Sequence, residues 1–278
     1  MLPRVTSELS RLADAYEGIE DMATFADAEA LAAYRETVLE RSRPQVDLLA
    51  PLLDGPARVL EVACGNGRLL IELAERGLLA EGLGLDIAAS RIEFAKRWAA
   101  EAGHGQMQVD AVDVFERELP NAHYDAAVCI TGAFGYFEPL IPGSALELAR
   151  RMLAALRPGG LLCLELYPAP HYRRMAEAGG GEARVWKELP ADDPWRYYLS
   201  HVVLERDGQV LVHNKTFIHR ETGEVDSGRS ERLLVYTPET IAELLGEAGF
   251  EGVGAFEGWT DAPYTGGDSM VVTARRPS

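Results

Sequence analysis

The chain has 278 residues and a formal net charge of −17, with 27 Lys and Arg against 44 Asp and Glu. This acidity argues against a nucleic-acid partner, because binding to a phosphate backbone depends on a basic face. No apolar run approaches the roughly 20 residues of a membrane span, and the charged N-terminus lacks a signal-peptide core. We therefore expect a globular protein of the cytoplasm that binds neither nucleic acid nor a membrane.

Residues 1–54 are expected to form an N-terminal helical segment. Between residues 27 and 41, apolar side chains recur at the spacing of one helix face. Pro44 suits the first turn of a second helix, which would end near residue 54.

From residue 57 to residue 167, short apolar segments alternate with amphipathic segments. This alternation is typical of a parallel sheet with crossover helices. Ser90 with Glu93, and Ser144 with Glu147, have the spacing of capping boxes, so each pair predicts the start of a helix. The strands are predicted at 58–62, 81–85, 124–130 and 161–166.

The pattern changes after residue 167. Residues 168–195 are rich in Pro, Gly and charged side chains, and we expect a mobile, glycine-rich tip at 179–181. Residues 196–236 alternate apolar and polar side chains on both sides of a hairpin turn at Asp207-Gly208. These features predict a small antiparallel insert. A helix that begins at Thr237 and two final strands, at 252–256 and 269–274, return to the first sheet.

The predicted fold class is therefore α/β, with a mostly parallel sheet, N-terminal helices and a small antiparallel β insert. We divide the chain into an N-terminal helical segment (1–54), an α/β domain (55–167 and 237–278) and an inserted antiparallel subdomain (168–236).

One turn carries the main functional signal. Residues 59–67 read Val-Leu-Glu-Val-Ala-Cys-Gly-Asn-Gly, and Asp86 follows 19 positions after Gly67. Small residues after a strand let the backbone approach a ligand, and an acid at the end of the next strand accepts hydrogen bonds from two ribose hydroxyls. The pattern predicts a nucleoside site at this edge of the sheet.

The segment acid-x-small-x-Gly-x-Gly, with Glu61 as the acid, resembles motif I of the class I S-adenosylmethionine (SAM) methyltransferases, and residues 83–87 resemble their motif II. A dinucleotide fingerprint would instead need a third glycine where Leu70 stands. The sequence departs from the family at Ala63, where a glycine is usual, and alanine fits there if its φ is negative. The resemblance implies a Rossmann-like fold, SAM as the cofactor, and an enzyme that transfers a methyl group.

The resemblance also assigns residues to the parts of the cofactor. The backbone of the turn would face its amino-acid end, and Glu61 would face the ammonium group. Asp86 would accept from the ribose hydroxyls in charge-assisted hydrogen bonds. The turn residues are Ala63, Gly65 and Gly67; Ile87, Asp110 and Ala111 would contact the adenosine, and Ile130 and Thr131 the methionine part.

The sequence that follows the strand at 124–130 bears on the methyl acceptor. It contains Gly-Ala-Phe-Gly-Tyr at 132–136 and lacks the Asn/Asp-Pro-Pro-Tyr tetrapeptide of DNA amino-methyltransferases. The run is similar to small-molecule methyltransferases, including amino-sugar and glycine N-methyltransferases, which implies a small-molecule acceptor and favours nitrogen over oxygen. The expected catalytic residues are Tyr136, whose hydroxyl needs a partner, and the general-base candidates Glu165 and His171.

Several alternatives stay open. Phe134 and Phe137 fit either the acceptor pocket or the core, and His201 and His213 of the insert are further residues that can face the cleft. The insert at 168–236 fits an acceptor lid or a homodimer contact. The chain also fits a non-catalytic SAM- or nucleotide-binding module, or a Rossmann enzyme with another adenosine cofactor. We expect no metal and no disulfide, because the three cysteines lack the spacing for either.

Overall fold

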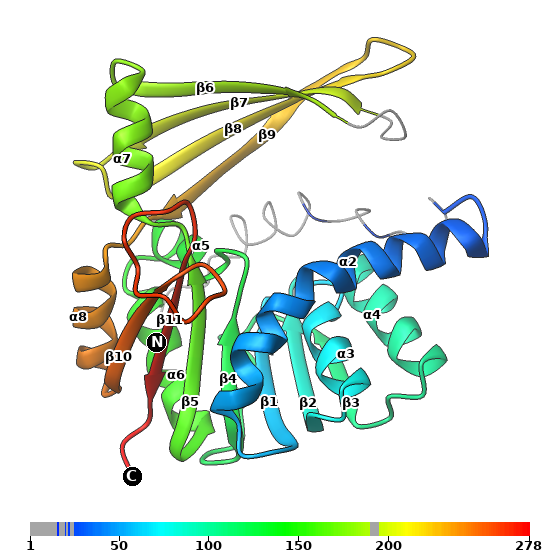
Figure 1. The fold of residues 1–278 in the computed structure, drawn as a ribbon, viewed down its shortest axis with the longest axis vertical. Coiled ribbons are helices and arrows are strands. Elements are labelled where there is room, and N and C mark those ends of the chain that lie inside the picture. Colours follow the sequence, from blue (N-terminus) through cyan, green and yellow to red (C-terminus); the bar gives the residue numbers. More distant parts are fainter. Residues whose placement is uncertain (1–15, 17–19, 21, 23–24, 190–194) are drawn as a thin grey trace.

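A twisted, mostly parallel sheet forms the centre of the molecule (Figure 1). The computed structural model describes residues 16, 20, 22, 25–189 and 195–278. Its seven-stranded sheet has the order β10-β11-β5-β4-β1-β2-β3, and only β11 runs antiparallel to its neighbours. The predicted α/β class is confirmed. The strands are β1 (Ala57–Val62), β2 (Leu79–Asp86), β3 (Met107–Ala111), β4 (Tyr124–Cys129), β5 (Leu156–Leu166), β10 (Glu251–Glu257) and β11 (Met270–Arg275).

Helices cover both faces of this sheet because alternate side chains of each strand point to opposite sides. In β1, Val59 packs into a core with Leu49 of the long N-terminal helix, whereas Leu60 packs with Leu148 on the other face. The first face is covered by α2 (Ala28–Leu49), the short helix η2 (Ala50–Leu52), α3 (Arg68–Glu75) and α4 (Ala89–Glu101). The other face is covered by α5 (Phe134–Leu140), α6 (Ser144–Ala155) and α8 (Pro238–Ala248).

The N-terminal segment differs from the prediction at Pro44. One continuous helix, α2, runs through this proline instead of ending before it. A proline inside a helix removes one backbone hydrogen bond, but Val38, Val46 and Leu49 on either side of it are buried against the sheet domain. Packing of this face outweighs the lost bond. The part of the prediction that concerns residues 1–15, 17–19, 21 and 23–24 lies outside the described residues.

The capping boxes predicted at Ser90 and Ser144 do not form, so these two predictions are wrong. The helix expected at Ser90 begins earlier, and the carboxylate of Asp86 accepts a hydrogen bond from the N–H of Ala88, the residue before that helix. Ser144 is the first residue of α6 rather than its cap, because the carboxylate of Glu138 accepts from the N–H groups of both neighbours of Ser144. At the start of α6 the carboxylate of Glu138 thus takes the place of the predicted cap. The box at Thr237 is present, with Thr240 as its second member.

Residues 168–236 form a second, antiparallel sheet that lies beyond the carboxyl ends of the parallel strands (Figure 1). The hairpin at Asp207-Gly208 is confirmed, between the second and third strands. The stretch at 168–189, which is rich in Pro, Gly and charged side chains, contains a helix and a strand. Tyr172 and Met175 pack this helix against Val202 and Leu211 at helical spacing. The elements are α7 (Ala169–Ala178), β6 (Glu182–Glu188), β7 (Trp195–Glu205), β8 (Val210–His219) and β9 (Val225–Leu234), in the sheet order β6-β7-β8-β9.

Cys64, Cys129 and Cys163 are buried and free, as expected. Among the described residues, no helix is both long enough and apolar enough to cross a membrane.

Candidate functional site

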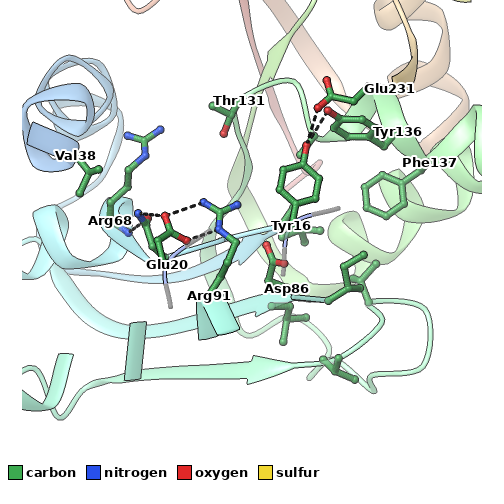
Figure 2. A pocket seen from close by; sticks show the side chains of 18 of the residues that line it. Tyr16, Glu20, Val38, Arg68, Asp86, Arg91, Thr131, Tyr136, Phe137 and Glu231 are labelled. Carbon is green, nitrogen blue, oxygen red and sulfur yellow. Dashed lines mark hydrogen bonds and ion pairs between the residues drawn. The ribbon is translucent and has the colours of Figure 1, made fainter. Parts of the chain in front are cut away.

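A cavity of roughly 380 Å³ lies where β1, β2 and β4 end, and Figure 2 shows residues that line it. Its floor contains Ala63, Asp86 and Thr131 from the ends of these three strands. Lys215 and Glu231 reach it from β8 and β9 of the antiparallel sheet. Ligands of open α/β sheets bind beyond the carboxyl ends of the strands, so this cavity occupies the position that the sequence motif predicts.

The turn after β1 has left-handed backbone at three alternate positions, with φ of 56° at Ala63, 53° at Gly65 and 73° at Gly67. Gly65 favours this conformation because it has no side chain, and a Cβ there would lie 2.6 Å from the guanidinium of Arg91, which would have to move. Alanine would fit at position 63 without strain only if its φ were negative, and because its φ is positive this L-residue is strained. The tight turn imposes that conformation because Gly67 N–H bonds to the carbonyl of Cys64 within it.

Asp86 lies at the cavity floor, at the end of β2. Its Oδ2 accepts from the N–H of Gly65 at 2.8 Å, and its Oδ1 accepts from the N–H of Ala88 at 2.9 Å. A carboxylate has about four lone-pair sites, so both oxygens keep capacity for ribose hydroxyls while the backbone bonds fix their orientation. Ile87 lines the same wall.

Glu61 lies under the turn and is almost fully buried, with 1% of its surface exposed. Burial raises the pKa of this carboxyl to about 8, and the nearby positive charge of Arg68 partly opposes that rise. Its Oε2 has no hydrogen-bond partner among the described residues. A buried acceptor without a partner fits the ammonium group of a SAM molecule, which would supply both a donor and a positive charge.

A buried carboxylate from the N-terminal segment, Glu20, lies over the turn and was missed by the sequence analysis. It is 2% exposed and accepts hydrogen bonds from Tyr34 Oη at 2.7 Å, Asn66 Nδ2 at 2.9 Å and Arg91 Nε at 2.6 Å. Figure 2 shows Glu20 beside Arg91 on the cavity wall. No local pattern marks Glu20, because its partners come from α2, the turn and α4.

A second group of polar side chains lies at the opposite end of the cavity, beneath the antiparallel sheet (Figure 2). Tyr136 Oη lies 2.9 Å from Tyr16 Oη, and Tyr16 Oη donates to Glu231 Oε1 at 3.4 Å. Lys215 Nζ forms an ion pair with the same Glu231 oxygen at 2.6 Å. Tyr167 lines the cavity next to this group. We call Tyr16, Tyr136, Tyr167, Lys215 and Glu231 the acceptor chamber.

The structure does not bring Asp110 and Ala111 to the cavity. Asp110 accepts from Gln108 Nε2 at 3.0 Å and pairs with Arg117 at 3.1 Å, whereas Val112, Asp113 and Val114 line the wall. The cavity lining therefore gives no support to the adenine contact expected at residues 110–111, because the carboxylate of Asp110 is engaged with Gln108 and Arg117.

Two of the three expected catalytic residues also lie outside the cavity lining. Glu165 accepts from the N–H of Thr131 at 2.8 Å and from Ser269 Oγ at 3.2 Å, so it braces the end of β4. His171 lies on α7 and its ring packs edge-on against Tyr172, with 5.1 Å between ring centroids. Tyr136 alone of the three lines the cavity.

The remaining expected residues lie at or near the cavity. Thr131 and Phe137 line it, whereas Phe134 is fully buried in the core beside Tyr236. Ile130 is buried below Thr131 and packs into the core instead of the wall. From the turn, Ala63 and Asn66 line the cavity, whereas Glu61, Gly65 and Gly67 are not among its lining residues. No group of three or more metal-ligand side chains gathers among the described residues.

The two histidines of the insert lie on opposite faces of the antiparallel sheet. His213 stands across from Glu231 and its Nε2 lies 2.7 Å from Ser200 Oγ and 3.0 Å from Tyr198 Oη. Burial and the charge of Lys215 lower the pKa of His213, which is therefore neutral at physiological pH. His201 pairs with Glu182 at the other face.

Comparison with known proteins gives the family. Residues 59–160 match the family described as "Methyltransferase domain". The demethylmenaquinone methyltransferase of Deinococcus radiodurans is 34% identical over 201 residues, which cover 72% of this chain and 70% of that protein. A trans-aconitate 2-methyltransferase of Streptomyces coelicolor is 30% identical over 186 residues, which cover 64% of this chain but only 55% of that protein.

Solved structures share the fold at lower identity. The CcbJ methyltransferase from Streptomyces caelestis has a TM-score of 0.69 at 16% identity, covering 85% of this chain and 90% of its own. SAM-bound CalS10, an amino pentose methyltransferase from Micromonospora echinaspora, has a TM-score of 0.62 at 20% identity, covering 90% and 97%. The glycine turn, the floor carboxylate and these relatives agree, and the chain belongs to the class I SAM-dependent methyltransferases, with SAM as its cofactor.

Proposed function

We propose that this methyltransferase acts on a small molecule and that the accepting atom is nitrogen. The cavity supports a small acceptor because it is a confined space of roughly 380 Å³ between the two sheets. Because the chain belongs to the SAM-dependent methyltransferases, we set aside the two alternatives that the sequence left open, a non-catalytic binding module and an enzyme with another adenosine cofactor. Bound SAM supplies a methyl group on a positively charged sulfur, and the protein's task is to position the acceptor in line with it.

We prefer nitrogen as the accepting atom because of the side chains in the acceptor chamber. A neutral amine attacks without help, whereas an alcohol needs a general base. Among the described residues that line the cavity there is no histidine, and the phenols of Tyr16 and Tyr136 have pKa values raised far above the usual range by burial. Glu231 is already paired with Lys215. This lining suits an acceptor that needs no strong base.

We propose the following roles for the residues that face the cofactor. Asp86 holds the ribose, Glu61 faces the ammonium group behind the turn, and Ile87 and Asp113 lie along the adenosine. Arg68 is half-buried next to the turn, where its Nη1 donates to Ser42 Oγ at 2.7 Å and to Gln45 Oε1 at 2.8 Å. These bonds aim a fixed positive charge at the amino-acid end of the site.

The antiparallel sheet is proposed as the lid of the acceptor site. Lys215 and Glu231 of this sheet line the cavity, so a lid role requires no large movement.

A homodimer contact stays a prediction, and it would use the outer face, where Trp186 is 66% exposed. Replacing Trp186 by Arg should then leave methyl transfer unchanged, and sedimentation of this variant checks the dimer.

A carboxylate oxygen is the second candidate for the accepting atom, since it is also a nucleophile that needs no base. Arg41, Arg91 and Lys215 place positive charges on the cavity wall. The relative from Streptomyces coelicolor is named for a carboxylate substrate, trans-aconitate.

Incubation with methyl-labelled SAM and matched pools of small amines, alcohols and carboxylates tests the proposal. We expect label in the amine pool. Label only among alcohols or carboxylates would contradict nitrogen as the accepting atom. Absence of label from all three pools, with SAM binding intact, would contradict a small-molecule acceptor.

A further inference from the structure

The acceptor chamber contains a directed chain of hydrogen bonds that ends on a carboxylate. The chain runs from Tyr136 of α5 to Tyr16 of the N-terminal segment and then to Glu231 of β9, over distances of 2.9 Å and 3.4 Å. Figure 2 shows the hydroxyl of Tyr16 joined to both Tyr136 and Glu231. Because its three members come from separate parts of the chain, their alignment is a property of the folded protein.

The direction of the chain follows from the chemistry at its end. Lys215 Nζ forms an ion pair with Glu231 Oε1 at 2.6 Å, and the carboxylate of such a pair only accepts hydrogen bonds. The single hydroxyl hydrogen of Tyr16 is therefore used toward Glu231. Tyr16 must accept from Tyr136, whose own hydrogen is used in turn. The oxygen of Tyr136 is left with a lone pair but no hydrogen for a ligand.

We propose that this chain makes Tyr136 a hydrogen-bond acceptor toward the substrate, so that the chamber selects molecules that present an N–H group and rejects carboxylates. The inference rests on the proposed function, because it concerns the acceptor end of the same site. Glu231 acts through Tyr16 and is a positioning residue. Its role is to fix the direction of the hydroxyls.

The charges around the chain agree with this selection. The positive charge of Lys215 is matched by Glu231 at 2.6 Å, and the neighbouring His213 is neutral because burial and Lys215 lower its pKa. The roof of the chamber therefore has no net charge to attract an anion. The rings of Tyr16 and Tyr136, edge-to-face with centroids 6.5 Å apart, offer electron-rich faces that favour an ammonium group.

Two small probes of similar shape test the inference without knowledge of the natural substrate. Cyclohexylammonium and cyclohexanecarboxylate are titrated into the protein saturated with S-adenosylhomocysteine, with binding followed by NMR. We expect the wild-type protein to bind the ammonium probe at least about tenfold more tightly, a difference of ~1.4 kcal/mol. Glu231→Gln should reduce this ratio to about threefold or less, because an amide can donate as well as accept.

The matched control is Glu205→Gln. Glu205 lies on β7 of the same sheet and pairs with Arg232 in an exposed ion pair at 2.5 Å, so this variant removes a similar pair outside the chamber. We expect it to keep the wild-type ratio. A ratio that changes equally in both variants would overturn the inference, as would a wild-type protein that binds the carboxylate as well as the ammonium probe.

Tyr16→Phe gives a second readout that a purely structural role would not produce. Without the oxygen of Tyr16, the hydrogen of Tyr136 is released and can point to a ligand. We expect this variant to bind cyclohexanecarboxylate more tightly than the wild type while its affinity for S-adenosylhomocysteine stays within about threefold. Unchanged carboxylate affinity overturns the inference. Failure of the proposed function is seen separately, as absence of label transfer from SAM to any amine.

Discussion

Gly135 of α5 lies against the backbone of Leu234 in β9, so closely that a Cβ on the glycine would be 2.7 Å from the Leu234 carbonyl oxygen. This is the contact at which the sheet domain and the antiparallel sheet meet next to the site. Tyr136 follows Gly135 directly, and Glu231 lies three residues before Leu234. The close approach thus holds the two side chains of the acceptor chamber at a fixed separation.

Gly135→Ala should push α5 and β9 apart. We expect a loss of about 1–3 kcal/mol in the free energy of unfolding, as for other overpacked contacts, and a fall in methyl transfer with little change in SAM affinity. Chemical denaturation and calorimetry measure these effects. The control is Gly246→Ala in α8, where no atom lies within 4 Å of the added Cβ; it should stabilise the protein by about 0.4–1 kcal/mol. Equal stabilities of the two variants would contradict the tight contact.

Asp86→Ala should weaken SAM binding by about 1.5–3 kcal/mol, the usual loss for hydrogen bonds to a charged group. The variant should also unfold at a lower temperature, since Asp86 accepts from the N–H groups of Gly65 and Ala88. Calorimetry with SAM and thermal unfolding separate the two effects. Asp110→Ala, at the next strand end, should leave SAM affinity within about twofold. If Asp110→Ala lost more SAM affinity than Asp86→Ala, the result would support the adenine contact that the sequence predicted at Asp110.

Ala63→Gly should relieve the left-handed strain in the turn. The strain of about 1–2 kcal/mol is partly offset by the greater entropy of glycine in the unfolded chain, about 0.5–1 kcal/mol. We expect a net gain of up to about 1 kcal/mol in the free energy of unfolding, measured with denaturant. Ala100→Gly, exposed in the regular helix α4, should instead lose about 1 kcal/mol. Destabilisation of the same size in both variants would argue against strain at Ala63.

Glu61 should make the stability of the cofactor-free protein depend on pH. Burial raises its pKa from 4.5 to about 8 in the folded state. Between these values the folded protein holds a proton that the unfolded chain has lost, so its stability falls as pH rises through this window. Glu61→Gln should flatten that slope in denaturant titrations, whereas Glu243→Gln, exposed on α8, should not. An unchanged slope in Glu61→Gln would contradict the raised pKa.

The same carboxyl should release its proton when SAM binds. A neighbouring ammonium group favours the ionised form, so wild-type protein at neutral pH should release up to about one proton on binding. Calorimetry in buffers of different ionisation enthalpy measures this release. Glu61→Gln should show little of it, and equal release from both proteins would place the ammonium elsewhere.

The sequence alone determined the sheet domain and the cofactor end of the site. The turn at 61–67 and Asp86 are local signals, because each depends on a strand end and on residues next to it in the chain. Their geometry follows once neighbouring parallel strands pair, which puts these ends together. The local pattern did not show that the side chain of Asp110 would pair with Arg117, further along the chain. Asp110 is therefore absent from the cavity lining.

Only the tertiary structure decided the acceptor end of the site. Tyr16 and Tyr136 are 120 residues apart, and Tyr16 and Glu231 are 215 residues apart, yet they share one chain of hydrogen bonds. Such contacts leave no periodic pattern in the sequence. They form because the antiparallel sheet packs its buried face against α5 and α7 over the open end of the parallel strands. The carboxylate of Glu231 at the end of this chain then sets which hydroxyl donates and which accepts.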